Sequence, residues 1–330
     1  MMVSSTTSIF KSMPVWVTLI ILLSLFSCRT TTSPSVKIAA HVWPGYELLF
    51  LARSLDWLDA NRVELVETES ASASMQAFRE GKVDAAALTL DEVLHLRAEG
   101  HPVTVVLVFN ISAGADKLLV KPDITSLQQL EGKRLGYEAG AVGELMLMKL
   151  LAEAGLSREQ LQLVPISIDL HYEYFTADRL DAVISYSPVS NRLLAENAVN
   201  LFDSRQLPDT IFDVLAVRTD RLNRQRRHAL RQIIEAHFRA RDYFNHNPYD
   251  SAYRMNERFQ LPAAAVLDAY RGLILPDKAH NYRLLSGHAD NIVRTATMIN
   301  LLLQSQGVAN ADSLDGLIDA ALLPTDFVDR

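Results

Sequence analysis

The sequence is almost without cysteine: Cys28 is the only one among its 330 residues. A single thiol cannot form an internal disulfide or a thiolate metal cluster, and no pattern indicates a catalytic thiol. The chain must therefore obtain its stability from packing. Hydrophobic residues make up 49% of it, and a chain of this length and composition can bury large cores in two domains.

Positive charge is also scarce. The 32 Lys and Arg residues are outnumbered by 39 Asp and Glu residues, which gives a formal net charge of −7. This balance argues against nucleic acid and against anionic lipid surfaces as partners. No long apolar run follows residue 27, so we expect no transmembrane segment beyond that point.

Catalytic motifs are missing as well. The sequence contains no Gly-x-Ser-x-Gly elbow, no Walker loop and no His-Glu-x-x-His motif. Its nine histidines are scattered, and no pair has a ligand spacing supported by a third donor. The spacing of Gly136, Gly140 and Gly143 does not fit a dinucleotide-binding fingerprint. We therefore predict no catalytic residue, no metal and no cofactor, and a protein that is not an enzyme.

Residues 1–27 have the layout of a signal peptide. Lys11 is their only charged residue, and Val15–Phe26 is an almost unbroken apolar run of 12 residues. That run is well short of the roughly 20 residues that a spanning helix needs. The polar residues 28–35 that follow show no periodicity, so we interpret them as a tether to the folded part.

The segment Leu25-Phe26-Ser27-Cys28 resembles the lipobox of bacterial lipoproteins, in which the cysteine becomes the lipidated N-terminus after cleavage. The resemblance implies lipidation at Cys28 and a location on the periplasmic side or the cell surface. The membrane would then be contacted through the N-terminal lipid only. A plain secretory peptide and an uncleaved anchor remain the alternatives.

From Val36 onward, short β-like runs alternate with helical stretches, which is typical of βα units on a parallel sheet. The order repeats with an offset near 97 residues, most visibly in Gly81–Ala86 against Asp178–Val183. The predicted strands are 36–42, 62–67, 83–88 and 103–109, then 133–137, 161–166, 180–186 and 199–202. The predicted helices are 46–60, 74–80 and 90–99, then 143–155, 170–178 and 188–197.

These patterns predict an α/β fold of two lobes, each a mostly parallel sheet flanked by helices, with a helical C-terminal tail. A further strand is expected at 212–217, before tail helices near 220–246, 249–258, 262–273, 288–306 and 312–321. The tail can return to the first lobe, with chain crossings near 113–118 and 211–217. We therefore expect lobe 1 to comprise 36–114 plus 215–330, and lobe 2 to comprise 115–214.

Ligands of open parallel sheets lie outside the carboxyl ends of the strands, and two facing lobes bring two such rims together in one cleft. This rule turns the strand assignments into a predicted binding site. The predicted ligand-binding residues are Trp43, Gly45, Tyr46, Ser72, Ala73, Ser74, Thr89, Asn110, Glu138, Val142, Gly143, Asp169, Tyr186 and Asp213.

Several of these residues have a second interpretation. Trp43 and Tyr46 either stack on a ligand or only fix a loop to the first helix. Ser72 and Ser74 are interpreted as N-cap residues, and the helix N-terminus they mark can also bind an anionic group. Gly143 belongs to a turn that would let the backbone approach a ligand closely.

The rims contain no Lys or Arg, whereas they do contain Glu69, Glu138 and Asp169 beside aromatic residues. Carboxylates accept hydrogen bonds from amines, and aromatic rings attract cations. We therefore expect a small ligand with a cationic or aromatic part, such as an amine or an aminopyrimidine.

Other polar residues receive structural interpretations. His41 is expected to be a polar loop residue and not a base. Asp84 and Asp181, at strand starts, are expected to be turn residues, and the basic segment 221–227 a solvated helix face.

The chain resembles the nitrate/sulfonate/taurine-type substrate-binding proteins of ABC importers, a family that includes binders of thiamine-pyrimidine precursors. The resemblance covers about residues 36–300. It rests on Trp43-Pro-Gly-Tyr46, Phe78-Arg-Glu-Gly81-Lys-Val-Asp84-Ala85-Ala86 and Val120-Lys-Pro-Asp123, followed by Leu127-x2-Leu130-x-Gly132-Lys133. It implies a type II periplasmic-binding-protein fold that closes on its ligand and docks on an ABC permease without performing chemistry. We expect the chain to act as a monomer.

Two other functions stay open. A module of the same fold could sense a ligand or bind a partner without feeding a transporter. Enzymes of pyrimidine biosynthesis share the fold, but they combine it with a cysteine-rich motif and an active-site histidine. Here the single cysteine lies in the lipobox-like segment.

Overall fold

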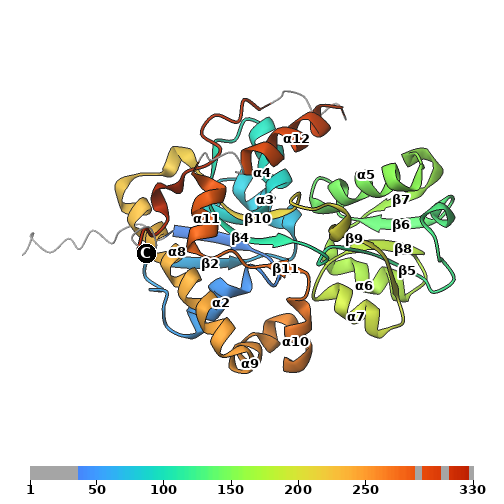
Figure 1. Ribbon diagram of the computed structural model, residues 1–330, viewed down its shortest axis with the longest axis horizontal. Helices are drawn as coiled ribbons and strands as arrows, with labels where there is room; N and C mark the ends of the chain where they lie inside the picture. Colours follow the sequence, from blue (N-terminus) through green and yellow to red (C-terminus); the bar gives the residue numbers. More distant parts are fainter. Residues whose placement is uncertain (1–35, 287–291, 306–311, 327–330) are drawn as a thin grey trace, which may run out of the picture. The chain divides into compact units, whose positions relative to one another are not determined.

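The computed structural model describes residues 36–286, 292–305 and 312–326, and its strands form two sheets (Figure 1). The predicted signal peptide, the tether and the lipidation site at Cys28 lie outside the described residues. We name the first sheet with the helices that flank it lobe 1, and the second sheet with its helices lobe 2.

The sheet of lobe 1 has the order β11-β4-β10-β3-β1-β2 within the described residues. Its strands are β1 (Val36–Ala40), β2 (Val63–Glu67), β3 (Ala85–Thr89), β4 (Val103–Ser112), β10 (Phe212–Arg218) and β11 (Leu273–Ile274). Strands β1, β2 and β3 are parallel, and β10 is antiparallel to both β3 and β4. Strand β4 therefore points the same way as β1 to β3. All ten of its residues are buried, as is usual for a strand covered on both faces.

The sheet of lobe 2 has the order β7-β6-β8-β5-β9 in the part of the chain that the structure describes. Its strands are β5 (Lys117–Val120), β6 (Arg134–Tyr137), β7 (Gln162–Pro165), β8 (Ala182–Ser185) and β9 (Val199–Asp203). Strand β5 is antiparallel to β8 and β9, and the other four strands share one direction. The strand that directly follows each crossing between the lobes, β5 or β10, is thus reversed in its sheet, and the short strand β11 is also antiparallel to β4.

The internal repeat predicted from the sequence is confirmed in the strand register. Ile38 pairs with Ala85 in lobe 1. Leu135 and Ala182, which lie 97 positions after Ile38 and Ala85, pair in the same way in lobe 2. The aspartates repeat in the same way. The carboxylate of Asp84 accepts the backbone N–H of Lys37 at 3.1 Å, and that of Asp181 accepts the backbone N–H of Arg134 at 2.9 Å.

Helices flank both sheets, and their ends carry residues that are typical of helix termini. They are α2 (Glu47–Ser54), α3 (Ala71–Arg79) and α4 (Leu90–Ala98) in lobe 1, and α5 (Val142–Ala154), α6 (Ile168–Thr176) and α7 (Val189–Ala195) in lobe 2. Helix α4 starts at a capping box formed by Thr89 and Glu92. Helix α5 ends at Gly155, whose φ of 68° places it in the left-handed region that glycine adopts readily.

The C-terminal helices return to lobe 1, as predicted (Figure 1). They are α8 (Arg224–His246), α9 (Pro248–Phe259), α10 (Ala263–Ala269), α11 (Lys278–Leu285) and α12 (Ile292–Ser305). The side chain of Asn281 in α11 contacts the edge of β4 that β11 leaves unpaired, accepting from Val108 N at 2.7 Å and donating to Val108 O at 3.0 Å. No helix among the described residues combines the length and hydropathy needed to cross a membrane.

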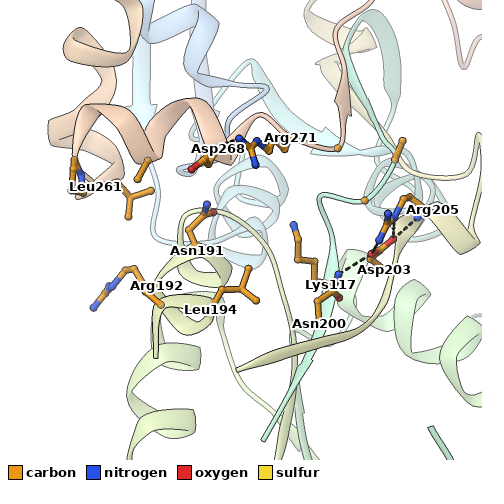
Figure 2. Close-up of a pocket in the computed structure, with 16 residues that line it drawn as sticks. Lys117, Asn191, Arg192, Leu194, Asn200, Asp203, Arg205, Leu261, Asp268 and Arg271 are labelled. Atoms are coloured by element: carbon orange, nitrogen blue, oxygen red, sulfur yellow. Dashed lines mark hydrogen bonds and ion pairs between the residues drawn. The ribbon is translucent and has the colours of Figure 1, made fainter. Parts of the chain in front are cut away.

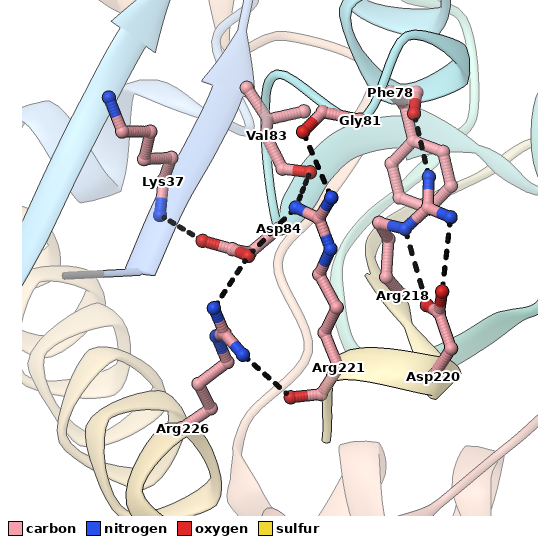
Figure 3. A network of polar contacts seen from close by, with 9 residues as sticks. All are labelled: Lys37, Phe78, Gly81, Val83, Asp84, Arg218, Asp220, Arg221 and Arg226. Atoms are coloured by element: carbon pink, nitrogen blue, oxygen red, sulfur yellow. Dashed lines mark hydrogen bonds and ion pairs between the residues drawn. The ribbon is translucent and has the colours of Figure 1, made fainter. Parts of the chain in front are cut away.

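The basic segment at the start of α8 is not a solvated face, so that prediction is wrong. Figure 3 shows the guanidinium groups of Arg221 and Arg226 directed at Asp84, at 3.1 and 3.4 Å. Arg221 also donates to the carbonyl of Gly81 at 3.0 Å. These contacts tie the C-terminal tail to the amino ends of the lobe 1 strands, opposite the rim that we predict to bind ligand.

Several elements differ from the sequence predictions. Strands β5 and β11 and helix α11 were missed, because each is short and has few apolar residues in a clear period. The helix predicted at 312–321 is wrong, since only a 3₁₀ turn over Ala320–Leu322 forms there. Residues 288–291 of a predicted helix lie outside the described residues. The predicted bounds of the two lobes remain a proposal, because sheet membership alone does not set where a lobe ends.

Replacing Asp84 with alanine should destabilise the fold more than the equivalent change in lobe 2. The Asp84 side chain is 8% exposed and serves two arginines, so its loss leaves both without their partner and should cost about 2–3 kcal/mol. Asp181 is 25% exposed and serves Arg134, and Asp181→Ala should cost about 1 kcal/mol. Urea unfolding of both variants measures the difference, and equal losses would contradict the role assigned to the Asp84 contacts.

Candidate ligand-binding site

A small cavity lies where the carboxyl ends of strands from both sheets meet. Its volume is about 10 Å³, close to the minimum that one water molecule needs. The lining residues are His41, Trp43, Tyr46, Ala71, Thr89, Glu92, Asp116, Val142, Tyr186 and Asp213. Val142 and Tyr186 belong to lobe 2, and most of the others follow strands or begin helices of lobe 1. The structure thus brings the two predicted rims together in a nearly filled site.

A chain of hydrogen bonds fixes the aromatic side chains of the lobe 1 rim. Trp43 Nε1 donates to Asn110 Oδ1 at 3.0 Å, and Asn110 Nδ2 donates to Asp213 Oδ2 at 2.6 Å. Tyr46 OH donates to the other oxygen, Asp213 Oδ1, at 2.6 Å. Gly45 is required here, because a Cβ atom at this position would overlap the side-chain oxygen of Asn110. Four of the predicted site residues therefore form one hydrogen-bond network, and a fifth, Gly45, packs against it.

The start of α2 is held by a buried ion pair. Glu47 directly follows Tyr46, and its fully buried carboxylate contacts Arg258 of α9 with Nε–Oε2 at 2.9 Å. The Arg258 guanidinium also lies 3.5 Å from the centre of the Phe50 ring. Burial raises the pKa of Glu47 to about 7, and Arg258 opposes that rise. The C-terminal tail thus positions the helix that carries the aromatic rim.

An aromatic cluster joins the two lobes across the cavity. The Trp43 and Tyr186 rings meet edge to face with centroids 5.2 Å apart. His41 lies 5.2 Å from Tyr46 and 5.7 Å from Tyr186. Burial, assisted by Arg258, lowers the pKa of His41 to about 3, so its imidazole is neutral at physiological pH. His41 was expected to be an ordinary polar loop residue, but it is buried and lines the cavity.

Carboxylic acids dominate the polar groups of the site. Glu92, Asp116 and Asp213 line the cavity. Asp91, which precedes Glu92, and Glu138, which contacts the start of α3, are also buried. Burial is the main cause that raises the pKa of all five, to about 6 for Asp116. None of the ten lining residues in the described chain is a lysine or an arginine. The site is therefore acidic, with no basic side chain to balance it at the cavity wall.

Some buried polar atoms have no hydrogen-bond partner among the described residues. They include Nδ1 of His41, Oδ2 of Asp116, Oε2 of Glu138 and the hydroxyl of Tyr186. Buried polar atoms are nearly always paired in folded proteins, so a cluster of unpaired ones needs an explanation. These four provide acceptors and one hydroxyl donor at the point where the lobes meet.

The amino end of α3 differs from the prediction. The helix begins at Ala71, three residues before the predicted start, and its N-cap is Ser70, whose hydroxyl accepts Ala73 N at 3.1 Å. The interpretation of Ser72 and Ser74 as N-caps is therefore wrong. The Ser72 N–H donates to Glu138 Oε1 at 2.9 Å, and the Ser74 hydroxyl lies 2.6 Å from that of Thr68.

The other predicted residues lie at different distances from the cavity. Thr89 and Val142 line it. Gly143 packs closely on the Glu138 backbone, where a Cβ atom would lie 2.9 Å from Glu138 N. Asp169 is exposed in the first turn of α6, where it accepts from the Ser167 hydroxyl.

Sequence reasoning missed two lining acids, Glu92 and Asp116. Glu92 has the spacing of a capping box with Thr89, a role that by itself suggests no ligand contact. Asp116 lies in the crossing between β4 and β5, where neither a strand end nor a helix start marked it. Its position in the predicted chain crossing, between a long buried strand and the second lobe, was the signal that could have identified it.

A larger groove of about 800 Å³ lies between lobe 2 and α10 (Figure 2). Figure 2 shows Lys117 and Asn191 directed toward the loop that carries Arg271. Four of its charged groups form ion pairs, since Arg205 contacts Asp203 at 2.6 Å and Arg271 contacts Asp268 at 2.9 Å. The small cavity, with its unpaired buried atoms, is therefore the better candidate for a specific site.

Exchange of Gly45 for alanine should break the aromatic network. The new methyl group must displace the Asn110 side chain, and we expect a loss of about 1–3 kcal/mol in the free energy of unfolding. Urea unfolding of Gly45→Ala, Asn110→Ala and the double variant forms a cycle. The double variant should lose less than the sum, because the clash partner is gone. Strict additivity would show that Gly45 and Asn110 do not interact.

Known proteins resemble this chain over most of its length. A Brucella abortus protein named as a candidate binding protein is 24% identical over 242 residues, which cover 68% of this chain and 74% of the relative. The crystal structure of the periplasmic aliphatic sulphonate binding protein SsuA from Escherichia coli has 17% identity and a TM-score of 0.70, over 86% of this chain and 97% of that one.

A ligand binding component of an ABC-type import system from Staphylococcus aureus has 14% identity and a TM-score of 0.71, over 87% of this chain and 97% of that one. These likenesses confirm the predicted two-lobed periplasmic-binding-protein fold. The model of the family described as NMT1/THI5 like matches residues 45–251, which is more than half of the chain. The chain therefore belongs to the NMT1/THI5-like family.

Proposed function

We propose that this protein is an extracytoplasmic solute-binding protein that captures a small molecule between its lobes and delivers it to an ABC-type importer. The observation that carries the proposal is the cavity at the meeting point of the two strand rims, lined from both lobes by buried polar atoms without partners. One protein of the same fold is named as a ligand binding component of an ABC-type import system and another as a periplasmic binding protein, which supports this assignment. In this role the protein performs no chemistry and works as a monomer.

The location follows from the N-terminal segment. The signal-peptide layout of residues 1–27 supports export, and the lipobox-like segment supports an anchor at Cys28 on the periplasmic side or the cell surface. The tether 28–35 would leave the folded part free to meet a permease.

We assign the ligand to the amines, including aminopyrimidines. Asp116 Oδ2 and Glu138 Oε2 are buried acceptors with no partner in the described residues, and ammonium or amino groups are the donors that match them. The rings of Trp43 and Tyr186 add faces that attract cations. The E. coli relative in the comparisons is named for sulphonates, but an anion in this cavity would face carboxylates without a basic side chain at the wall.

Ligand entry requires the lobes to separate, because the cavity has room for about one water molecule. The chain crosses between the sheets after β4 and again before β10, and two crossings of this kind suit a hinge. A ligand that binds the closed form better then draws the lobes together.

A thermal-shift screen tests the function directly. Amines, polyamines and pyrimidines should raise the melting temperature in a saturable way, because binding to the native state alone stabilises it by mass action. A shift with sulfonates or nitrate only would contradict the ligand class and leave the binding function standing. No shift with any compound would favour a partner-binding module in place of a solute-binding protein.

Asp116→Asn should weaken binding of the best amine about 10- to 100-fold, because a charge-assisted hydrogen bond becomes a neutral one. Asp169→Asn makes the same chemical change at an exposed site of lobe 2 and should leave the affinity unchanged. Isothermal titration measures both. Equal effects of the two variants would remove Asp116 from the binding site.

Binding of an amine should strengthen as the pH rises from about 5 to about 7. Burial raises the pKa of Asp116 to about 6, so part of this carboxyl is protonated at the lower pH. A cationic ligand favours the ionised carboxylate, and binding below the pKa must therefore release a proton. Titration in two buffers of different ionisation enthalpy, with an amine that stays protonated, measures that release. Proton uptake, or an affinity that falls over this range, would contradict a cationic ligand.

A further inference from the structure

Two helices present their amino ends at the cavity, α3 from lobe 1 and α5 from lobe 2. The first N–H groups of a helix lack partners inside the helix and lie at the positive end of its dipole. Such ends bind anions when they are free. The sequence left open whether the amides near 72–74 bind an anionic ligand, and the same question applies to those near 141–143.

In the structure one amide at each helix end, Ser72 N or Val142 N, is occupied by a carboxylate from the opposite lobe. Ser72 N of α3 donates to Oε1 of Glu138, which directly follows β6 of lobe 2, at 2.9 Å. Val142 N of α5 donates to Oε1 of Glu92, which belongs to α4 of lobe 1, at 3.4 Å. Each lobe thus supplies one carboxylate to a helix of the other.

The neighbouring amides of α3 are also paired within the helix start. Ala73 N donates to the Ser70 hydroxyl at 3.1 Å, and Ser74 N donates to Ser70 O at 3.0 Å. An incoming anion would have to displace Glu138 to reach Ser72 N. It would also meet Asp116 and Asp213, which line the same cavity.

Burial of each glutamate costs free energy, so we expect both side chains to have a function at these positions. Glu92 is 1% exposed and Glu138 is 4% exposed, and a buried carboxylate is tolerated only when it is well paired. Glu92 is paired on both oxygens, since Oε2 also accepts Thr89 N at 2.8 Å. Glu138 is paired on Oε1, while Oε2 has no partner among the described residues.

We propose that Glu92 and Glu138 determine ligand specificity by filling the anion-binding amides of α3 and α5 from the opposite lobe, so that the site rejects anions. This inference rests on the proposed binding function. It explains why two helix ends that could bind an oxyanion do not do so in this protein. Removing the Glu138 side chain uncovers Ser72 N and deletes one repelling charge. The variant then offers a small oxyanion a free helix end.

The test compares sulfonate binding by the full-length protein and its variants, with methanesulfonate as the probe. Wild type should show no saturable binding up to the highest concentration used. Glu138→Ala should bind with a dissociation constant at least tenfold below that concentration. Glu92→Gln keeps the capping hydrogen bond to Thr89 N and replaces the oxygen that accepts from Val142 N with an amide group, so the double variant should bind more tightly again. The backbone amide NMR signal of Ser72 should shift on addition of methanesulfonate to Glu138→Ala.

Glu69→Ala is the matched control, because it removes one negative charge beside the same end of α3 from an exposed side chain. It should remain unable to bind methanesulfonate. If Glu138→Ala does not fold, Glu138→Gln takes its place. It keeps an acceptor for Ser72 N, and we expect a smaller gain of about threefold, since only the charge is lost.

The outcomes separate this inference from the proposed function. Wild type that binds an amine, with folded Glu138 variants that gain no sulfonate affinity, would overturn the inference and leave the function intact. Wild type that binds methanesulfonate as tightly as the variants would also overturn it, as would a gain in Glu69→Ala equal to that in Glu138→Ala. If neither amines nor methanesulfonate bind any of the proteins, the proposed function fails together with the inference.

Discussion

The burial of carboxylic acids at the meeting point of two sheets is the constraint that organises this protein. Glu92, Asp116, Glu138 and Asp213 are nearly inaccessible to solvent, and burial raises the pKa of each. Such groups persist only where hydrogen bonds or a ligand satisfy them. Asp213 is satisfied by Tyr46 and Asn110, whereas Asp116 and Glu138 each keep one oxygen without a partner in the described structure. These two oxygens mark the part of the site where we expect a ligand to bind.

The repeated architecture of the two lobes brings strand ends and helix starts of both lobes to the site. The register of β1 with β3 recurs 97 residues later in β6 with β8, so equivalent strand ends and helix starts converge from both sides. Helix α3 and helix α5 then present their amino ends to the same cavity. In this chain each end receives a glutamate of the opposite lobe, and the contact turns two anion-attracting ends into part of an acidic site.

Much of this arrangement could be predicted from the sequence. The alternation of short apolar runs with helical stretches placed most strands within two or three residues, and the rule that ligands lie at strand carboxyl ends brought Trp43, Tyr46, Thr89 and Tyr186 to the cavity. Strand β5 escaped prediction because four residues carry too little periodicity. The contacts of Glu92 and Glu138 could not be predicted, because they join residues 50 and 66 positions apart through the packing of two lobes.

The role of the tail was also hidden in the sequence. A run of arginines at a helix start looks like a solvated face until tertiary structure brings Asp84 beside it, and Asn281 gives no sign that it covers the edge of β4. Both contacts depend on the return of the chain to lobe 1, which local patterns indicate only in outline.

A crystal structure of the complex with the tightest-binding compound tests the central claim most directly. The account predicts a nitrogen donor within about 3 Å of Asp116 Oδ2 or Glu138 Oε2, with the ligand against Trp43 and Tyr186. An anion held by the amides of Ser72 and Val142, with both glutamates displaced, would contradict it, and so would a ligand seated in the groove beside α10.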